Sequence, residues 1–262
     1  MAKILILGDS HGNISFVADA VRNAKISFDI DYAIQVGDFG FYPVIFKNFD
    51  KFGKFEVPLY VIDGNHENHE WLHKQKKSWK QWKEKNLIFC PRGHTIEIDN
   101  RLIAFVGGAM NVDRPQQGSI DKRTTNYLLQ DEVNEISEKL NESKRVDLMV
   151  THSCPHSVGI GMHGNPLFDY MIERYIIDAF NVSIGPSNDV GEQTLLRLWK
   201  QLENKPLNWV FGHFHIHHYS KVEDTEFWCV GSTDHSDNNL YCIPYIYDTE
   251  ENKVQRIEKI RI

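Results

Sequence analysis

The chain has 262 residues, of which 41% are hydrophobic and 12% aromatic, enough to bury the core of one large globular domain over residues 1–262. Its formal net charge of −7 disfavours a broad basic face that grips nucleic acid, although it does not rule out local cationic contacts. No run of about 18 apolar residues indicates a membrane span, and the first residues are typical of a short strand, not of a signal peptide. We therefore expect a soluble cytoplasmic protein, for which stable binding to nucleic acid is disfavoured.

Six short and nearly continuous apolar runs are typical of strands that are buried on both faces. These runs are Lys3–Leu7, Tyr32–Val36, Leu59–Ile62, Leu102–Val106, Asp147–Val150 and Asn208–Phe211. The segments between them have the helical spacing of apolar residues, at about Ile14–Ala24, Val44–Phe52, Glu67–Lys85, Asp131–Asn141, Phe168–Phe180 and Glu192–Leu202. The alternation of strands with helices predicts an α/β fold.

The pattern changes after Phe214. Shorter β-rich pieces joined by polar turns follow, at His217–Val222, Glu226–Val230, Tyr245–Asp248 and Val254–Ile260. We expect these late strands to run antiparallel and to form a second sheet that packs on the first.

A lysine-rich segment, Lys74–Lys85, contains Trp79 and Trp82. Such a segment is either a local nucleic-acid face or a solvated helix whose tryptophans pack inward. We favour the solvated helix, because charged residues on one side and large apolar residues on the other are the ordinary pattern of a surface helix.

Side chains that bind metals stand directly after five of the six apolar runs. Asp9 and His11 follow the first run, and on an extended backbone residues two apart face the same side. The other candidates are Asp38 in Gly37-Asp38, Asn65 in Gly64-Asn65-His66-Glu67, His152 in Thr151-His152, and His213 and His215 in Gly212-His213-Phe214-His215. Each piece alone is more often a turn, a helix cap or a packed histidine. As an ordered set they predict one site, because sites in α/β sheets form beyond the carboxyl ends of the strands.

The mixture of oxygen and nitrogen donors suits Mn, Fe, Zn, Ni or Co ions better than Ca, whose sites are built from oxygen alone. The ordered series GDSHG, GDFG, GNHE, TH and GHFH resembles the calcineurin-like metallophosphoesterases, and it spans most of the chain, from Asp9 to His215. The resemblance implies an α/β/β/α fold, in which a two-sheet β-sandwich is flanked by helices and carries two metal ions at the ends of its strands.

The resemblance also implies a role for each motif residue. Asp9, His11 and His215 would hold one metal ion, and Asn65, His152 and His213 would hold the other. Asp38 would bridge the two ions, and His66 would lie beside the leaving group without binding metal. We expect two divalent transition-metal ions, with Mn foremost, that activate a shared water for attack on phosphorus.

The match departs from the protein Ser/Thr phosphatases of this family, which carry Asp-Arg soon after the second motif, where this chain has Phe41-Tyr42. The sequence is closer to the smaller phosphoesterases of bacterial and phage type. We therefore prefer a phosphorylated small molecule or a nucleotide as the substrate, hydrolysed as a phosphodiester or a phosphomonoester. A protein phosphatase, a nuclease and a non-catalytic metal-binding regulator are the alternatives.

Two further parts of the chain are candidates for contact with the substrate. Arg114, in the polar segment Asn111–Thr125, is either a phosphate contact or a solvated loop cation. The glycine-rich loop Ser153–Asn165 leaves directly from His152, and it either shapes the substrate pocket or simply connects two elements. The remaining histidines, His69 and His217 among them, are expected to be surface or packing residues.

Overall fold

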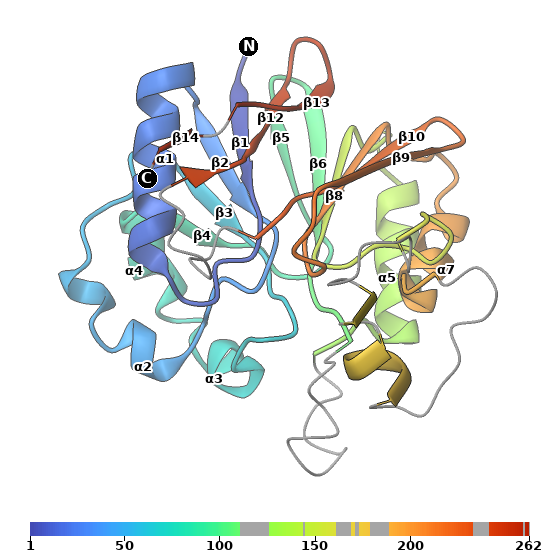
Figure 1. Cartoon of the computed structure of the whole chain (residues 1–262), viewed down its shortest axis with the longest axis horizontal. Coiled ribbons are helices and arrows are strands. Elements are labelled where there is room, and N and C mark those ends of the chain that lie inside the picture. The colour runs from blue at the N-terminus through green and yellow to red at the C-terminus, as the bar shows by residue number, and fades with distance from the viewer. Residues whose placement is uncertain are drawn as a thin grey trace.

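The computed structural model describes residues 1–110, 126–143, 145–160, 169–170, 173–178, 189–232, 241–258 and 260–261. Two six-stranded sheets pack against each other, and helices lie on the outer face of each (Figure 1). This is the two-sheet α/β sandwich flanked by helices that the sequence predicts, so the expected fold class is confirmed. That the whole chain forms a single domain stays a prediction.

The first sheet has the strand order β13-β12-β1-β2-β3-β4. Its strands are β1 (Lys3–Leu7), β2 (Tyr32–Gln35), β3 (Leu59–Val61), β4 (Leu87–Phe89), β12 (Tyr245–Asp248) and β13 (Lys253–Arg256). Strands β1 to β4 are parallel, whereas β12 pairs antiparallel with β1 and β13 antiparallel with β12. The carboxyl ends of β1, β2 and β3 therefore meet at one edge of this sheet.

The second sheet has the strand order β5-β6-β7-β8-β10-β9. Its strands are β5 (His94–Ile98), β6 (Arg101–Val106), β7 (Leu148–Thr151), β8 (Asn208–Phe211), β9 (His218–Val222) and β10 (Thr225–Cys229). Strands β6, β7, β8 and β10 are parallel, and β5 and β9 are the antiparallel edge strands. A small pair, β11 (Tyr241–Cys242) with β14 (Ile260–Arg261), lies outside both sheets.

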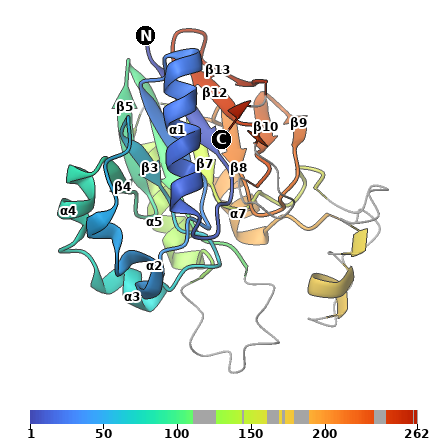
Figure 2. The same ribbon diagram turned by 60° about the vertical axis from the view of Figure 1, so that its left-hand side comes forward.

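Helices cover the outer face of each sheet (Figure 2). Those on the first sheet are α1 (Ile14–Phe28), α2 (Pro43–Phe46), a 3-10 turn (Phe49–Lys51), α3 (His69–Lys74) and α4 (Trp79–Glu84). Those on the second sheet are α5 (Gln130–Asn141) and α7 (Gln193–Gln201). A π-helical turn is found at Glu173–Asp178.

The longest helix, α1, shows why these residues form a helix at this place. The side chain of Asn13 caps its first turn by accepting the Phe16 N–H at 3.2 Å, and the helix ends at Asp29, whose left-handed φ of 53° ends the helical backbone. Its residues Val17, Ala20 and Ala24 are buried and recur at helical spacing, so one face packs on the first sheet.

Three hydrophobic layers hold the sandwich together. The central layer lies between the two sheets and includes Ile6, Val36 and Val210. One outer layer joins the first sheet to α1–α4, and the other joins the second sheet to α5 and α7. Strands such as β1 and β8 have apolar neighbours on both faces, which explains why they appear in the sequence as continuous apolar runs.

Some predicted elements differ from the structure. The late strands do not form a sheet of their own: β9 and β10 extend the second sheet, β12 and β13 extend the first, and β10 pairs parallel with β8. The predicted helix Glu67–Lys85 is two short helices, α3 and α4. Trp82 is buried and Trp79 packs on the same core, as expected for tryptophans that face inward. Among the described residues, none of the helices is both long and apolar enough to cross a membrane.

Candidate metal centre

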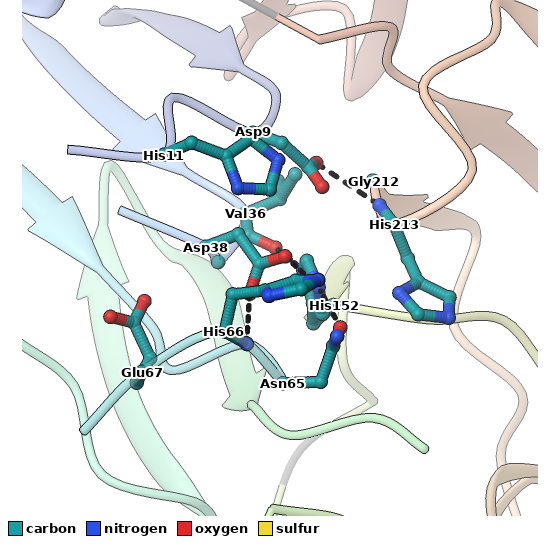
Figure 3. Close-up of polar contacts among 12 residues, drawn as sticks. Asp9, His11, Val36, Asp38, Asn65, His66, Glu67, His152, Gly212 and His213 are labelled. Atoms are coloured by element: carbon teal, nitrogen blue, oxygen red, sulfur yellow. Dashed lines mark hydrogen bonds and ion pairs between the residues drawn. The ribbon is translucent and has the colours of Figure 1, made fainter. Parts of the chain in front are cut away.

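The seven predicted ligands come together at one end of the sandwich. Asp9, Asp38 and Asn65 stand just beyond β1, β2 and β3 of the first sheet. His152, His213 and His215 stand at or beyond the ends of β7 and β8 of the second sheet, and Figure 3 shows most of these side chains around a common centre. Each sheet thus supplies part of the site, and the packing of the two sheets assembles it.

One group of donor atoms is formed by Asp9, His11 and His215. The Nε2 atom of His215 lies 3.1 Å from Oδ2 of Asp9 and 3.0 Å from Nε2 of His11. Two imidazole nitrogens so close together are stable only when a proton or a cation lies between them, since their lone pairs otherwise repel. One buried carboxylate and two converging ring nitrogens fit a divalent transition metal.

A second group is formed by Asp9, Asp38 and His152, whose donor atoms all lie within 4.8 Å of one another. Nδ1 of His152 lies 2.8 Å from the carbonyl oxygen of Val36, which can only accept, so Nδ1 carries the proton. Nε2 is then the atom that faces Oδ1 of Asn65 at 3.1 Å and Oδ2 of Asp38 at 3.4 Å. A backbone carbonyl that fixes the tautomer in this way is a common support for a histidine ligand.

The remaining predicted ligand, His213, lies next to this second group. Its ring centroid is 5.1 Å from that of His152 in an edge-to-face arrangement, while its backbone N–H donates to Oδ1 of Asp9 at 3.0 Å (Figure 3). Burial, with the nearby His152 adding to it, lowers the pKa of His213 to about 3. The ring is therefore neutral at pH 7, which is the form that binds metal.

The backbone of the site is held in an uncommon conformation. Four of the seven candidate ligands have positive φ angles: His11 at 45°, Asp38 at 51°, His213 at 67° and His215 at 54°. For non-glycine residues this region costs about 1 kcal/mol or more each, and such residues cluster at functional sites. Asp9 and His11 converge as expected, but the extended backbone that was expected to bring them together is absent, because the chain leaves β1 and turns at His11.

The two carboxylates share one pattern of hydrogen bonding. Oδ1 of Asp9 accepts the His213 N–H, and Oδ1 of Asp38 accepts the His66 N–H at 2.8 Å. In each case Oδ2 is the atom that faces an imidazole. The backbone of one strand end thus orients a ligand from another.

Glycines make room for these carboxylates. A Cβ at Gly64 would lie 2.0 Å from Oδ1 of Asp38, and a Cβ at Gly212 would lie 2.2 Å from Oδ1 of Asp9. Both distances are far shorter than any contact between non-bonded carbon and oxygen. The glycine that precedes Asn65 and the glycine that precedes His213 are therefore required by close packing of neighbouring ligands.

Asp38 and His152 control each other's charge. Burial by itself raises the pKa of Asp38, but His152 outweighs it and holds that pKa well below its usual value. Burial likewise lowers the pKa of His152, yet Asp38 and Asp9 raise it to about 10. In the metal-free protein the pair is therefore a carboxylate facing an imidazolium, and the proton occupies a place that a cation can take.

Comparison with known proteins shows which family the chain belongs to. The model of the calcineurin-like phosphoesterase family matches residues 2–217, which include all seven candidate ligands. The chain belongs to the calcineurin-like phosphoesterase family.

Solved structures of other proteins share this fold at low sequence identity. The TT1561 protein of Thermus thermophilus is 12% identical, with a TM-score of 0.63 over 99% of this chain and 98% of that one. A putative 5'-nucleotidase from Staphylococcus aureus is 10% identical, with a TM-score of 0.55 over 99% of this chain and 54% of that one. No curated protein matches the chain in sequence.

In this chain the two positions soon after the second motif, Phe41 and Tyr42, carry no cation. Phe41 is fully buried and stacks on Phe46 and Trp82. The hydroxyl of Tyr42 donates to the carbonyl oxygen of His66. Phe41 thus packs in the core next to the second motif, and Tyr42 holds the backbone of the third motif. A protein phosphatase carries Asp-Arg at these two sequence positions.

Glu67 has a role that sequence reasoning missed. Its buried carboxylate accepts the backbone N–H groups of Phe39 at 2.8 Å, Gly40 at 3.2 Å and Phe41 at 2.5 Å. Glu67 therefore holds the loop that follows Asp38. The signal available in the sequence was an acidic residue next to Asn65 together with a short Phe-Gly-Phe turn whose N–H groups need acceptors.

A second buried network supports the turn at Asn65. Asp63 accepts from Arg92 at 2.8 Å, and Arg92 also donates to Glu132 at 3.1 Å on helix α5. The side chain of Asn126 donates to the carbonyl oxygen of Asn65 at 3.2 Å. This network links the third motif of the first sheet to residues that precede and begin α5, and its partners are too far apart in the sequence to be paired by inspection.

Arg114, the Ser153–Asn165 loop and His69 were also singled out in the sequence. Arg114 lies outside the described residues, as does the second part of the Ser153–Asn165 loop, from residue 161 on. In the first part, the backbone N–H groups of Ser157 and Gly159 donate to Asp189. His69 is buried, with Nε2 2.9 Å from the Gly64 carbonyl oxygen, and is the packing residue that was expected.

Proposed function

We propose that this protein is a dinuclear-metal phosphoesterase. One observation carries the proposal: two groups of convergent donors, one with His11 and His215 and the other with Asp38 and His152, share the buried carboxylate of Asp9. Two divalent ions, Mn foremost with Fe, Zn, Ni or Co as alternatives, would lower the pKa of a water and neutralise phosphate oxygens when bound.

The proposed ligands of the first ion are Asp9, His11 and His215. Those of the second are Asn65, His152 and His213, with Asp38 as the bridge. Oδ2 of Asp38 suits this role, because Oδ1 is occupied by the His66 N–H. Asp9 also lies between the two groups, so it is the alternative bridge.

His66 is the proposed proton donor to the leaving group. Its ring lies 5.3 Å, centroid to centroid, from that of His11, and its backbone is held on both sides, by Asp38 through the N–H and by Tyr42 through the carbonyl. The backbone of His66 is therefore held in place, and its imidazole lies beside the metal centre without belonging to either donor group.

The His66→Ala variant tests this role. An alkoxide leaving group needs a proton whereas an activated aryl oxide does not, so we expect kcat on an alkyl phosphate ester to fall by about 100-fold or more, with a much smaller loss on the p-nitrophenyl ester. Equal losses on both substrates would remove the proposed role.

A small phosphorylated molecule, above all a nucleotide, is the proposed substrate. The support is the buried Phe41 and the hydrogen-bonded Tyr42 at the positions where a protein phosphatase carries its phosphate-clamping arginine. Whether a monoester or a diester is cleaved faster is left to the assay, and the cytoplasmic location stays a prediction.

The decisive experiment reconstitutes the protein with Mn, Ni, Fe or Zn and measures the bound metal. Each form is then assayed on aryl phosphate mono- and diesters, cyclic nucleotides, a phosphopeptide and single-stranded DNA. We expect about two ions per chain and turnover of aryl and nucleotide esters. A strong preference for the phosphopeptide would favour the protein phosphatase, and full metal content without turnover of any ester would favour the non-catalytic regulator.

A further inference from the structure

A cavity of about 420 Å³ lies beside the metal centre, between α3, α4, the end of β4 and the start of α5. It lies within the usual size range of small-molecule sites. Figure 2 shows α3 and α4 together on one flank of the molecule, with α5 behind them. Asp63, on its inner wall, is two residues before the candidate ligand Asn65, so the cavity adjoins the site without using any of its predicted ligands.

The lining on one side of the cavity is aromatic and apolar. It includes Trp79, Phe89 and Pro91. The rings of Trp79 and Phe89 pack 4.8 Å apart, centroid to centroid, and Trp79 is only partly buried, so part of the indole borders the cavity. A rigid aromatic wall of this kind stacks well against a planar ring.

The rim of the cavity is positively charged, although the whole chain is acidic. The segment from His73 to Lys85 contains six lysines and one glutamate, and Lys76 and His73 line the cavity. Lys74 pairs with Glu70 and Lys85 donates to the backbone of Phe52, whereas the side chain of Lys76 is exposed at the rim. A local field of this sign attracts an anion.

The inner wall carries hydrogen-bonding groups with little net charge. The guanidinium of Arg92 is held between the carboxylates of Asp63 at 2.8 Å and Glu132 at 3.1 Å. The side chain of Glu132 is 36% exposed. Its Oε2 accepts from Arg92 and from the Leu129 N–H, so Oε1, which accepts from Arg92 alone, is the atom that retains acceptor capacity toward the cavity. An uncharged ring that bears N–H groups fits this wall better than a phosphate does, because a phosphate there would face two carboxylates.

We propose that this cavity binds a nucleotide, free or at the end of a single strand, as a site separate from the metal centre. The base stacks on Trp79 and presents an N–H edge to Glu132, whose carboxylate is held in place by Arg92. The phosphate lies at the rim, near Lys76. The site goes beyond the proposed hydrolysis and does not depend on it, since it uses no metal ligand.

The test measures binding to the full chain by calorimetry in the presence of a chelator, which prevents hydrolysis of the probe. The probes are AMP, ribose 5-phosphate, which lacks the base, and a short fluorescein-labelled oligothymidylate. We expect AMP to bind about tenfold or more tightly than ribose 5-phosphate, because only AMP can stack. Binding of AMP alone identifies a free nucleotide, and binding of the oligonucleotide as well identifies the end of a strand.

Paired variants locate the site. Trp79→Leu and Lys76→Glu are each expected to weaken AMP binding about tenfold. Trp199→Leu on α7 and Lys221→Glu on β9 make the same chemical changes elsewhere, and His11→Ala disables the metal centre. These three controls are expected to bind AMP as the parent does, and circular dichroism checks that each variant is folded.

Three results would overturn the proposal. One is equal binding of AMP and ribose 5-phosphate. Another is unchanged AMP binding in a folded Lys76→Glu variant. The third is loss of AMP binding in His11→Ala, which would place the nucleotide at the metal centre instead and would leave the proposed phosphoesterase function standing.

Discussion

The close contact between Gly212 and Asp9 gives the sharpest test of how the centre is assembled. A Cβ added at Gly212 would lie 2.2 Å from Oδ1 of Asp9 and 2.9 Å from a methyl carbon of Val36. Neither neighbour is the free end of a flexible side chain, because Asp9 is fully buried and its Oδ1 holds the His213 N–H. The Gly212→Ala variant must therefore displace the carboxylate that both donor groups share.

The size of the effect follows from two terms. Forcing a methyl group into a filled core costs about 1–3 kcal/mol. Loss of the hydrogen bond between Asp9 and His213 leaves a buried N–H without its acceptor, which costs about 1–3 kcal/mol more. We expect the metal-free variant to lose about 2–6 kcal/mol of stability, which for a chain of this size is a fall in Tm of roughly 5–20 °C.

Calorimetric unfolding and metal content after reconstitution with Mn provide the assay. We expect the variant to retain fewer than two ions and to lose most of its activity on an aryl phosphate diester. Gly53→Ala is the matched control, since a Cβ there meets nothing within 4 Å, and it should behave as the parent. A Gly212→Ala protein with parental Tm and two tightly bound ions would refute the reasoning.

Two further predictions follow from the buried charges. Because the pKa of His152 is raised to about 10 in the metal-free protein, its pairing with Asp38 stabilises the fold fully below pH 6.5 and is lost as the pH rises toward 10. The Tm of the metal-free protein should therefore fall as the pH rises across this window. Metal binding at pH 7.5 should release about one proton, which makes the calorimetric binding enthalpy depend on the buffer. A binding enthalpy that is the same in all buffers would contradict this prediction. Glu67→Ala should lower the free energy of unfolding in urea by about 2–4 kcal/mol, because three backbone N–H groups lose their acceptor. Glu67→Gln should lower it less, because one acceptor oxygen remains. Equal stability of Glu67→Ala and the parent would show that water replaces the carboxylate.

The position of the site along the chain was determined by the sequence itself. Strands buried on both faces must be continuously apolar, so β1 and β8 were found with their observed bounds. The polar residues that follow them stand out for the same reason. Five such ends with aspartate, asparagine or histidine indicated one metal site, and the residues that form it lie within the family match over residues 2–217.

Pairing between distant segments was decided only by the tertiary structure. The sequence did not show that β12 would pair with β1 and β10 with β8. The residues of an apolar strand do not specify which other strand it pairs with. It also missed β4, since three residues are too few to display a period. The sequence placed the ligands at strand ends, but the packing of two sheets brought His152 to face Asp38.

The same distinction holds for the residues that support the site. Asp9, Asp38 and their histidines were visible because a metal requires those donor types. Glu67, Arg92 and the glycines that receive the carboxylates act through contacts of a few ångströms, and such contacts exist only after the chain has folded. Local composition determines which chemistry is available, and three-dimensional packing determines which atoms meet.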